Sequence, residues 1–448
     1  MIQHEKYKKA DLKWINEIPF KWDIKRLKDF GTFQNGVSKG KEYFGFGFPF
    51  ISYGNVYKDK ISIEYVDKLA NSNIEEQKLY SVKEGDVFFT RTSETIDEIG
   101  ISSTCLKTID NSTFSGFVIR FRQRGNILLK EFSNYYFKAS INRLFLSNEI
   151  NIVTRASLNQ GVLGSLPVLI PDKKEQLLIA NYLNAKTQTI DKKINLLTQK
   201  ANYYKEYRKS IINETVCKGL DKYVKLKNSG FKEFGDIPEH WNVLRLKSLG
   251  NIETSSVDKK IIENEDLVKL VNYTDVYGNL NKEIVNNDNF MVVSANIKQV
   301  KSKFLKKGDV LFTPSSETIE DIGVSAVVME DLGNTLYSYH LLRLRFSKEI
   351  HLNFKKYLFN NDLVQNYLSK SATGTTRKIL GLSAFNNIIL IVPPSLKEQE
   401  EIAKYLDDKT QLIDKVLNNI SSQIISLKEL RKTLINDVVT GNIKVTEN

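Results

Sequence analysis

Two stretches of the chain combine strong helix formers with a strict spacing of apolar positions. From Asp172 to Lys218 there is neither proline nor glycine, which predicts one long helix or two joined helices. Apolar positions recur there at alternating intervals of four and three residues, and the C-terminal stretch repeats this spacing. A 3.5-residue period held over seven intervals indicates a coiled-coil seam, and the partner expected for each seam is the other copy. The predicted seam residues are Ile190, Ile194, Leu197, Ala201, Tyr204, Ile211, Ile413, Leu417, Ile420, Ile424, Leu427 and Leu434.

Arg208 and Arg431 interrupt the two seams at equivalent places. A polar seam residue can set the register of a coiled coil. Alternatively, each arginine extends its charged end past the edge of the seam.

The helical stretches belong to a tandem duplication of the whole chain. Counted from Pro171 and Pro394, 14 of 24 positions are identical. Ile18 to Gly31 matches Ile237 to Gly250 at 7 of 14 positions, and a glycine-aspartate-valine segment matches at 13 of 21. Because the order of matches is the same in both halves, the chain consists of two copies of one unit.

The segment before each helical stretch has short apolar runs separated by glycine and asparagine, a pattern typical of strands and turns with a few helices. Phe48 to Tyr53, Val87 to Thr90 and Phe117 to Arg122 are predicted strands, and the polar stretch Arg91 to Asp97 is a predicted loop. In the third strand Arg120 and Arg122 share one face, as Arg343 and Arg345 do in the second copy. Such a face is either solvated or turned towards phosphate.

Composition restricts the function classes only weakly. The net charge of +12 favours a polyanionic partner. The two cysteines provide neither a disulfide framework nor a zinc spacing, and no apolar leader or membrane span is apparent, so a cytoplasmic location is expected.

Catalytic motifs are missing where a nucleic-acid enzyme would carry them. There is no phosphate-binding loop with the Walker spacing, and Pro393-Pro394 lacks the flanking residues of an amino-methyltransferase motif. Pro171-Asp172 has no Glu-x-Lys partner of a nuclease, and the four histidines show no metal-ligand spacing. We therefore expect no catalytic residues, no metal site and no cofactor bound by this chain.

The combined pattern resembles the DNA specificity (S) subunit of type I restriction-modification systems. The motifs that carry the resemblance are the Ile-Pro-x-x-Trp entries at Ile18 and Ile237, the Gly-Asp-Val turns at Gly85 and Gly308, and the Glu-Gln helix starts at Glu175 and Glu398. The resemblance covers essentially the full chain. It implies an α+β fold, with two pseudo-repeated mixed α/β target recognition domains separated by two long antiparallel coiled-coil helical regions. The expected boundaries are 1–170 and 227–393 for the recognition domains, and 171–226 and 394–448 for the helical regions.

The same resemblance implies the function and the partners. Each recognition domain would read one half of a bipartite double-stranded DNA target, and the diverged segments 34–80 and 252–303 favour an asymmetric target. Two methyltransferase (M) subunits would bring S-adenosylmethionine, and restriction (R) subunits, where present, would use ATP and Mg. The alternatives are a module of a fused or orphan methylation system, or a coiled-coil scaffold that does not bind DNA.

Side chains suited to base or phosphate contacts occur in loops of both copies. The candidate DNA-binding residues are Tyr53, Asn55, Arg91, Thr92, Ser93, Arg120, Arg122, Arg155, Asn159, Gln160, Asn272, Tyr273, Ser315, Ser316, Arg343, Arg345, Thr375, Thr376, Arg377 and Lys378. Arg91 aligns with Pro314 inside a matched loop, so this position is expected to carry different specificity in the two copies.

Overall fold

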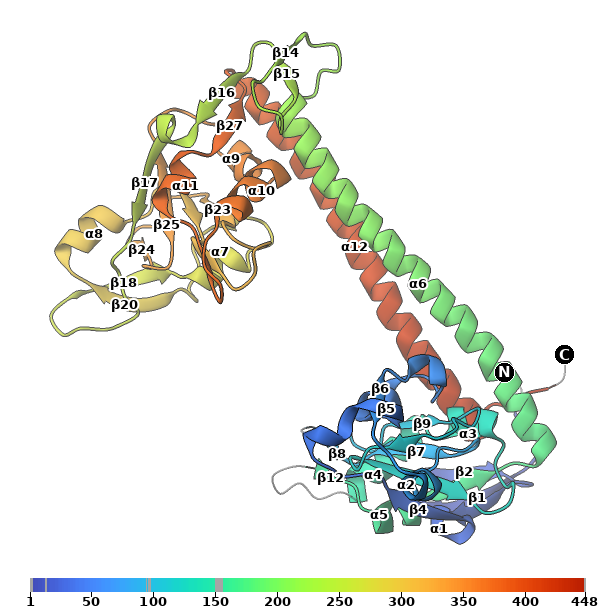
Figure 1. The fold of residues 1–448 in the computed structure, drawn as a ribbon. Coiled ribbons are helices and arrows are strands. Elements are labelled where there is room, and N and C mark those ends of the chain that lie inside the picture. Colours follow the sequence, from blue (N-terminus) through green and yellow to red (C-terminus); the bar gives the residue numbers. More distant parts are fainter. Residues whose placement is uncertain (1–2, 13, 94, 96–97, 150–155, 447–448) are drawn as a thin grey trace. The chain divides into compact units, whose positions relative to one another are not determined.

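The computed structural model describes residues 3–12, 14–93, 95, 98–149 and 156–446. The chain divides into two compact units, the first comprising Met1–Thr198 with Ser421–Asn448 and the second Gln199–Ile420. Two long helices, α6 (Lys173–Lys218) and α12 (Leu396–Val439), each contribute one part to each unit (Figure 1). Each unit therefore contains one mixed domain and a pair of helical segments.

The mixed domain of the first unit is built on two sheets. The larger sheet is antiparallel, with the strand order β4 (Gly31–Asn35), β11 (Val118–Gln123), β7 (Val87–Thr90) and β9 (Ser102–Thr104). The smaller sheet has the order β10 (Thr113–Phe114), β5 (Phe44–Ile51) and β6 (Lys68–Ala70), with β10 parallel to β5.

Three short strand pairs and several helices complete this unit. The pairs are β1 (Tyr7–Leu12) with β2 (Ile15–Pro19), β3 (Asp23–Arg26) with β13 (Pro167–Ile170), and β8 (Thr92–Ser93) with β12 (Ala156–Ser157). The helices are α1 (Leu27–Phe30), α2 (Ile74–Leu79), α3 (Lys130–Tyr136), α4 (Ser140–Glu149) and α5 (Gln160–Ser165), with 3₁₀ turns η1 (Lys41–Tyr43), η2 (Tyr53–Tyr57) and η3 (Ile63–Tyr65).

The repeated motifs close the base of the first domain. Strand β3 follows the Ile-Pro-x-x-Trp entry and pairs with β13, which precedes α6. Trp22 is fully buried, and its Nε1 donates to Glu175 Oε2 at 2.8 Å. The neighbouring Gln176 accepts from the Leu129 amide at 2.7 Å and donates to the Pro171 carbonyl. The tryptophan and the Glu-Gln pair therefore fix the start of α6 against the domain.

The second unit repeats this architecture. Its larger sheet has the order β17 (Gly250–Thr254), β25 (Leu342–Phe346), β21 (Val310–Phe312), β23 (Ser325–Val328) and β19 (Glu283–Ile284). Its smaller sheet has the order β20 (Met291–Ala295), β18 (Asp266–Val271) and β24 (Thr335–Tyr337). The short pairs are β14 (Leu226–Asn228) with β15 (Asp236–Pro238), β16 (Asn242–Arg245) with β27 (Ile389–Val392), and β22 (Ser315–Ser316) with β26 (Lys378–Ile379).

The helices of the second unit and its motif contacts correspond to those of the first. Its helices are α7 (Tyr273–Tyr277), α8 (Ile297–Lys303), α9 (Phe354–Phe359), α10 (Asp362–Ser371) and α11 (Leu382–Asn386), with the 3₁₀ turn η5 (Leu246–Ser248). Trp241 is fully buried and its Nε1 donates to Glu398 Oε1 at 2.9 Å. Gln399 accepts from the His351 amide at 2.8 Å.

The long helices pack as predicted from the spacing of apolar residues. Every predicted seam residue is buried or half-buried, and from Leu417 to Leu434 all positions outside the 3.5-residue pattern are exposed. In the first unit the start of α6 shares a core with the end of α12, through Ile179 and Val438. In the second unit the end of α6 shares a core with the start of α12, so the two helices are antiparallel.

The two seam arginines form ion pairs with aspartates of the opposite helix. Arg431 Nε lies 3.0 Å from Asp191 Oδ1 in the first unit, and Arg208 Nε lies 3.6 Å from Asp414 Oδ1 in the second. Each guanidinium therefore reaches across the seam to a carboxylate. Among the helices of the described residues, none is both long and apolar enough to span a membrane.

The strand predictions agree with the structure except at the polar loop. Val87 to Thr90 is β7 as predicted, while the other two strands begin or end a few residues away from their predicted limits. The prediction of a loop from Arg91 to Asp97 is incomplete, because Thr92 and Ser93 form the short strand β8. This strand exists only through its pairing with β12, which lies more than sixty residues later in the chain.

Candidate nucleic-acid interface

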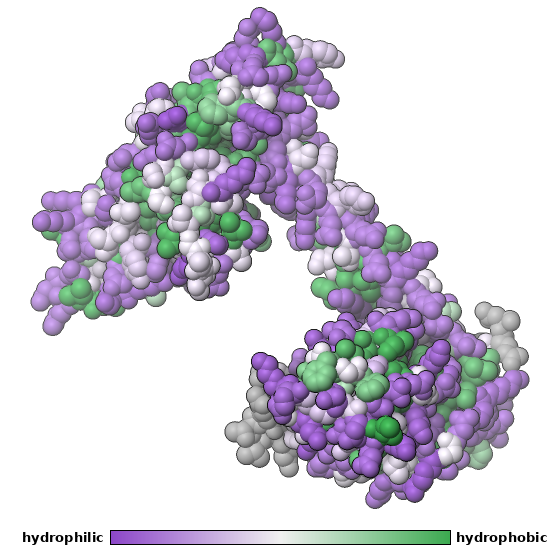
Figure 2. All heavy atoms as spheres, viewed as in Figure 1, coloured by the Kyte–Doolittle hydropathy of each residue, from purple (hydrophilic) through white to green (hydrophobic). Residues whose placement is uncertain are grey.

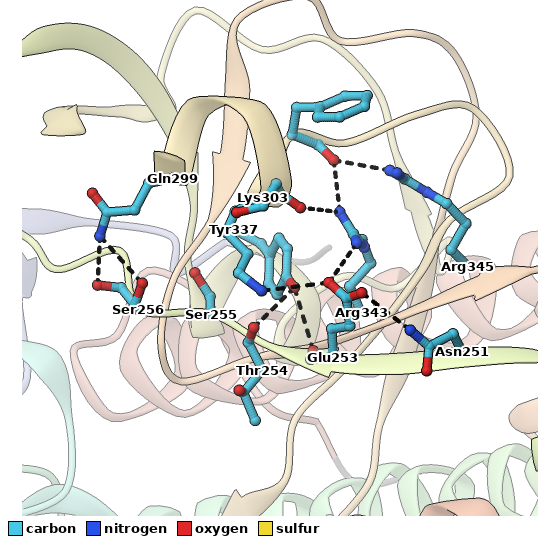
Figure 3. A network of polar contacts seen from close by, with 12 residues as sticks. Asn251, Glu253, Thr254, Ser255, Ser256, Gln299, Lys303, Tyr337, Arg343 and Arg345 are labelled. Carbon is cyan, nitrogen blue, oxygen red and sulfur yellow. Dashed lines mark hydrogen bonds and ion pairs between the residues drawn. The ribbon is translucent and has the colours of Figure 1, made fainter. Parts of the chain in front are cut away.

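The arginine-bearing strands β11 and β25 do not present a basic surface. Arg120 is only 6% exposed and Arg343 only 3%, so the prediction of a solvent- or phosphate-facing strand face is wrong for both. Arg343 Nη2 donates to Glu253 Oε2 at 2.9 Å and its Nη1 donates to the Phe304 carbonyl at 2.9 Å (Figure 3). Arg120 donates to the Ser81 carbonyl and to the Gln34 side chain. Both arginines tie strands to neighbouring loops.

The other two strand arginines hold the Gly-Asp-Val turns. Arg122 Nε and Nη2 each lie 2.6 Å from an oxygen of Asp86, whose side chain is fully buried. Arg345 binds Asp309 in the same two-pronged way, at 2.8 and 2.7 Å. A two-pronged arginine–carboxylate pair is geometrically specific and strong. Its presence in both copies accounts for the repeated turn by structure rather than by DNA contact.

Away from these pairs, three segments of the first unit meet through hydrogen bonds. The turn η2 carries Tyr53, whose hydroxyl donates to the Thr92 carbonyl at 2.9 Å, and Tyr57 donates to the Tyr53 hydroxyl at 3.0 Å. Thr92 lies on β8, which pairs with β12. The amide of Leu158, just after β12, donates to the Arg91 carbonyl at 2.8 Å. We call η2, the segment 91–93 and the segment 156–160 the first recognition surface.

The second unit assembles the same three segments. Tyr273 and Tyr277 on α7 stack with their ring centroids 5.3 Å apart, and the Tyr277 hydroxyl donates to Asp321 Oδ2 at 2.8 Å. Strand β22 pairs with β26, and the Leu380 amide donates to the Pro314 carbonyl at 2.8 Å. We call α7, the segment 314–316 and the segment 373–380 the second recognition surface.

The structure separates the candidate residues by exposure. On the two recognition surfaces the exposed candidates are Asn159, Thr375, Thr376 and Arg377, and the half-buried ones are Tyr53, Arg91, Thr92, Gln160, Tyr273, Ser315 and Lys378. The buried candidates are Asn55, Ser93, Asn272 and Ser316, all below 9% exposed. Arg155 lies outside the described residues.

The buried polar candidates have structural partners, so their prediction as DNA contacts is not supported by their positions. The Asn55 side chain accepts from the Ser52 amide and donates to the Tyr65 carbonyl, which closes the turn η2. The Ser93 hydroxyl donates to Glu98 Oε2 at 3.0 Å. Asn272 precedes α7: its backbone amide donates to Asp275 Oδ2 at 2.7 Å and its Nδ2 donates to the Leu270 carbonyl at 3.5 Å, while its buried Oδ1 has no hydrogen-bond partner among the described residues.

Sequence reasoning missed the second tyrosine of each pair. Tyr57 is 42% exposed and Tyr277 is 39% exposed. Both belong to a repeated pattern, Ser-Tyr-Gly-Asn-Val-Tyr at 52–57 and Asn-Tyr-Thr-Asp-Val-Tyr at 272–277, in segments that otherwise scarcely match. A search for aromatic pairs at equal spacing in both copies would have found them.

Titratable groups on the second recognition surface and in the turn beside it follow their local contacts. The hydrogen bond to Asp321 raises the pKa of Tyr277, so this hydroxyl stays a donor at neutral pH. Burial, reinforced by Lys259 and Arg377, lowers the pKa of His340. Among the described residues no group of three or more His, Cys, Asp or Glu side chains is arranged to hold a metal ion.

The fold and these surfaces define a tandem-repeat protein that carries two equally built polar recognition surfaces on a coiled-coil frame. The sequence matches the family described as the type I restriction modification DNA specificity domain twice, over residues 19–202 and 238–425. The chain belongs to this family and is a specificity subunit with two recognition domains.

Relatives match over nearly the whole chain. The MjaIX specificity subunit of Methanocaldococcus jannaschii is 25% identical over 97% of this chain and 96% of its own length. The MjaVIII specificity subunit of the same organism is 22% identical over 98% of this chain and 97% of its own length.

Solved structures agree in fold. The S subunit (HsdS) from Thermoanaerobacter tengcongensis has a TM-score of 0.54 at 15% identity and covers 97% of this chain. A chain from a study of complex assembly and conformational transition in the type I R-M system has a TM-score of 0.71 at 14% identity, covering 95% of this chain and 99% of its own.

Proposed function

We propose that this specificity subunit is non-catalytic and that each recognition surface reads one half of an asymmetric, bipartite DNA target. The observation that carries the proposal is that the two recognition surfaces share the same backbone hydrogen bonds but present different side chains. Arg91 of the first surface corresponds to Pro314 of the second, and both carbonyls accept an equivalent amide hydrogen bond. Because the backbone is held alike while the side chain changes from a cation to an apolar ring, the two surfaces would select different bases.

The exposed polar groups suit a DNA partner. Arg377 and the neighbouring Thr375 and Thr376 are exposed on the second surface, and Asn159 is exposed on the first. Arginine, asparagine and hydroxyl side chains bind both phosphate oxygens and base edges. The net charge of +12 supplies attraction to a polyanion over a longer range.

The helical segments would bind two M subunits. Apolar side chains point away from the seam in both units, where a soluble helix pair would ordinarily carry polar residues. In the first unit these are Leu196, Ile425 and Leu430, at 56%, 60% and 54% exposure. In the second unit Tyr203, Tyr207 and Leu412 are 76%, 54% and 58% exposed. In the view of Figure 2, hydrophilic residues dominate the surface of the molecule, and hydrophobic residues are exposed among them.

The chemistry would then reside in the partners. The M subunits would bind S-adenosylmethionine and methylate the target base, and R subunits, where the system includes them, would use ATP and Mg. The complex would act in the cytoplasm, where the host DNA lies. This chain would contribute recognition and assembly and would bind no cofactor itself.

Base-resolved methylation mapping in cells that carry this chain with its M subunit tests the proposal. The expected result is a bipartite, asymmetric motif with a fixed gap, absent from cells lacking the chain. Exchanging residues 1–170 for those of a different specificity subunit should change one half of the motif only. An assembled complex with an active M subunit that gives no chain-dependent mark would refute DNA specificity and favour a scaffold.

A further inference from the structure

A β-turn lies beside each recognition surface. Its backbone is closed by an equivalent hydrogen bond in the two copies, but its side chains differ. In the first unit Ser115 to Val118 form this turn, closed by the Val118 amide and the Ser115 carbonyl at 3.0 Å. In the second unit Ser338 to Leu341 form it, closed by the same kind of bond at 3.0 Å. Phe117 and His340 occupy the same position, two residues after the serine.

We propose that this turn position is specificity-determining, with Phe117 contacting an apolar base edge in one half-site and His340 forming a hydrogen bond with a base edge in the other. The inference rests on the proposed DNA-reading function. It adds two residues to the recognition surfaces and assigns a different contact chemistry to each copy.

The turn is joined to the first recognition surface through Arg91. The Arg91 amide donates to the Phe117 carbonyl at 3.0 Å, and its guanidinium Nη1 donates to the Gly116 carbonyl at 3.3 Å. The Arg91 carbonyl in turn accepts from Leu158 of the third segment. Phe117 therefore stands directly beside residues that we assign to DNA contact.

Phe117 is a costly residue to leave in water. Its side chain is 63% exposed, and it lines an open hollow of about 740 Å³ together with Lys39 and Lys68. Phenylalanine cannot form a hydrogen bond with a base edge, but it makes apolar contact with the C5-methyl group of thymine. An exposed aromatic ring at the edge of a hollow that two lysines also line is suited to a position where a thymine faces the protein.

Gly116 explains why only one side chain is presented by the first turn. A Cβ at this position would overlap Ser38 Oγ and lie 3.0 Å from the Val37 carbonyl oxygen. The second turn carries Tyr339 at the corresponding position, with its ring centroid 3.9 Å from that of His340. The second turn thus supports its histidine with a neighbouring aromatic ring.

His340 belongs to a polar environment. Lys259, Arg377 and Asp258 all act on it electrostatically, and Arg377 is also one of the exposed residues of the second recognition surface. Partial burial, together with these two cations, lowers the pKa of His340, so the neutral imidazole predominates at neutral pH. A neutral imidazole offers one donor and one acceptor, which matches a base edge better than a phosphate.

The test measures the sequence preference of the chain purified as a complex with its M subunits, by selection from a DNA library that randomises each half-site. Phe117→His should shift the preference at one base pair of one half-site about tenfold away from thymine, and His340→Phe should shift one base pair of the other half-site by a similar factor. The base preference at all other positions of the motif should remain unchanged. Phe117→Leu, which keeps an apolar contact, should retain the thymine.

Phe20→His is the matched control, because Phe20 is 61% exposed and lies in the same unit but outside the recognition surface. This variant should leave the base preference at every position of the motif unchanged. If Phe117→His and His340→Phe assemble with M subunits and both select the wild-type motif, the inference is overturned and the proposed function stands. If the wild-type complex selects no motif, both are overturned.

Discussion

Two adjacent lysines on α9, Lys355 and Lys356, are both buried but have opposite environments. Lys355 is 7% exposed, donates to the Gly308 carbonyl at 2.9 Å and lies over the Phe346 ring; within the described part of the chain no carboxylate is among its hydrogen-bond partners. Lys356 is 8% exposed and pairs with Glu283 at 2.6 Å and Asp407 at 2.9 Å. Burial lowers the pKa of Lys355 to about 8. Burial opposes the charge of Lys356 too, but hydrogen bonds to the two carboxylates raise its pKa.

We expect substitution of each lysine by methionine to change stability in opposite directions. For Lys355, the fall in pKa from 10.5 to about 8 corresponds to about 3 kcal/mol of penalty for the charged form. Removing the charge relieves this penalty, while leaving the Gly308 carbonyl without its donor costs about 1–2 kcal/mol. Lys355→Met should therefore raise the free energy of unfolding at pH 7 by about 1–2 kcal/mol. Lys356→Met should lower it by about 2–4 kcal/mol, because two carboxylates lose their shared cation.

The pH dependence provides an independent check on Lys355. Between pH 8 and 10.5 the unfolded state holds more protons at this lysine than the folded state, so the wild-type chain gains stability as pH rises through this window. The advantage of Lys355→Met should therefore shrink from pH 8 upwards. For Lys356, whose pKa is raised, the stabilisation is complete below 10.5 and is lost only at higher pH.

Urea unfolding of the full chain at pH 7, 9 and 10 measures the differences, and hydrogen exchange of the α9 amides localises them to this helix. A Lys355→Met variant that is destabilised at pH 7, or whose difference from wild type does not change between pH 7 and 10, would refute the reasoning. Lys356→Met is the matched control for the change in packing when a lysine is replaced by methionine, since both lysines lie on α9 and are buried to a similar extent.

Three further outcomes follow from the other contacts. Arg122→Met should destabilise the chain by about 3–5 kcal/mol in urea unfolding, because it leaves the buried Asp86 carboxylate unpaired; a loss below 1 kcal/mol would contradict this. Trp22→Phe keeps an aromatic side chain but removes the donor to Glu175 and part of the buried ring, and should lower the thermal midpoint by an amount equivalent to at least about 1–3 kcal/mol. Arg377→Ala should reduce the salt dependence of DNA binding by about one phosphate contact, and an unchanged slope would exclude such a contact.

The frame of this protein could be predicted from sequence because its signals are periodic and repeated. The 3.5-residue spacing identifies a seam without reference to any other part of the chain, and the seam positions from Ile190 to Ile211 and from Ile413 to Leu434 are all buried or half-buried. The duplication likewise identifies the pairs Trp22 with Glu175 and Trp241 with Glu398 as shared features, although not their hydrogen bonds.

The recognition surfaces were less predictable because burial depends on distant segments. Alternation places Arg120 and Arg122 on one strand face, but cannot show that loops from elsewhere in the domain cover that face. Ser93 lies in a segment with the composition of a surface loop, yet it is buried and its hydroxyl donates a hydrogen bond to Glu98. Exposed aromatic residues such as Phe117 were missed because apolar residues in a strand pattern are ordinarily assigned to the core.

The discontinuous make-up of the first unit has a consequence for synthesis on the ribosome. The second unit is a single segment, Gln199–Ile420, whereas the first also needs Ser421–Asn448, which packs against a domain translated at the beginning. Ile435, Val438 and Val439 fill the core beneath the N-terminal domain, so that core stays incomplete until the final helix has left the exit tunnel. The first unit, although its mixed domain is translated first, therefore completes its core after the second unit. Removal of residues 435–439 and those that follow should expose apolar surface in the first unit and leave the second unit intact.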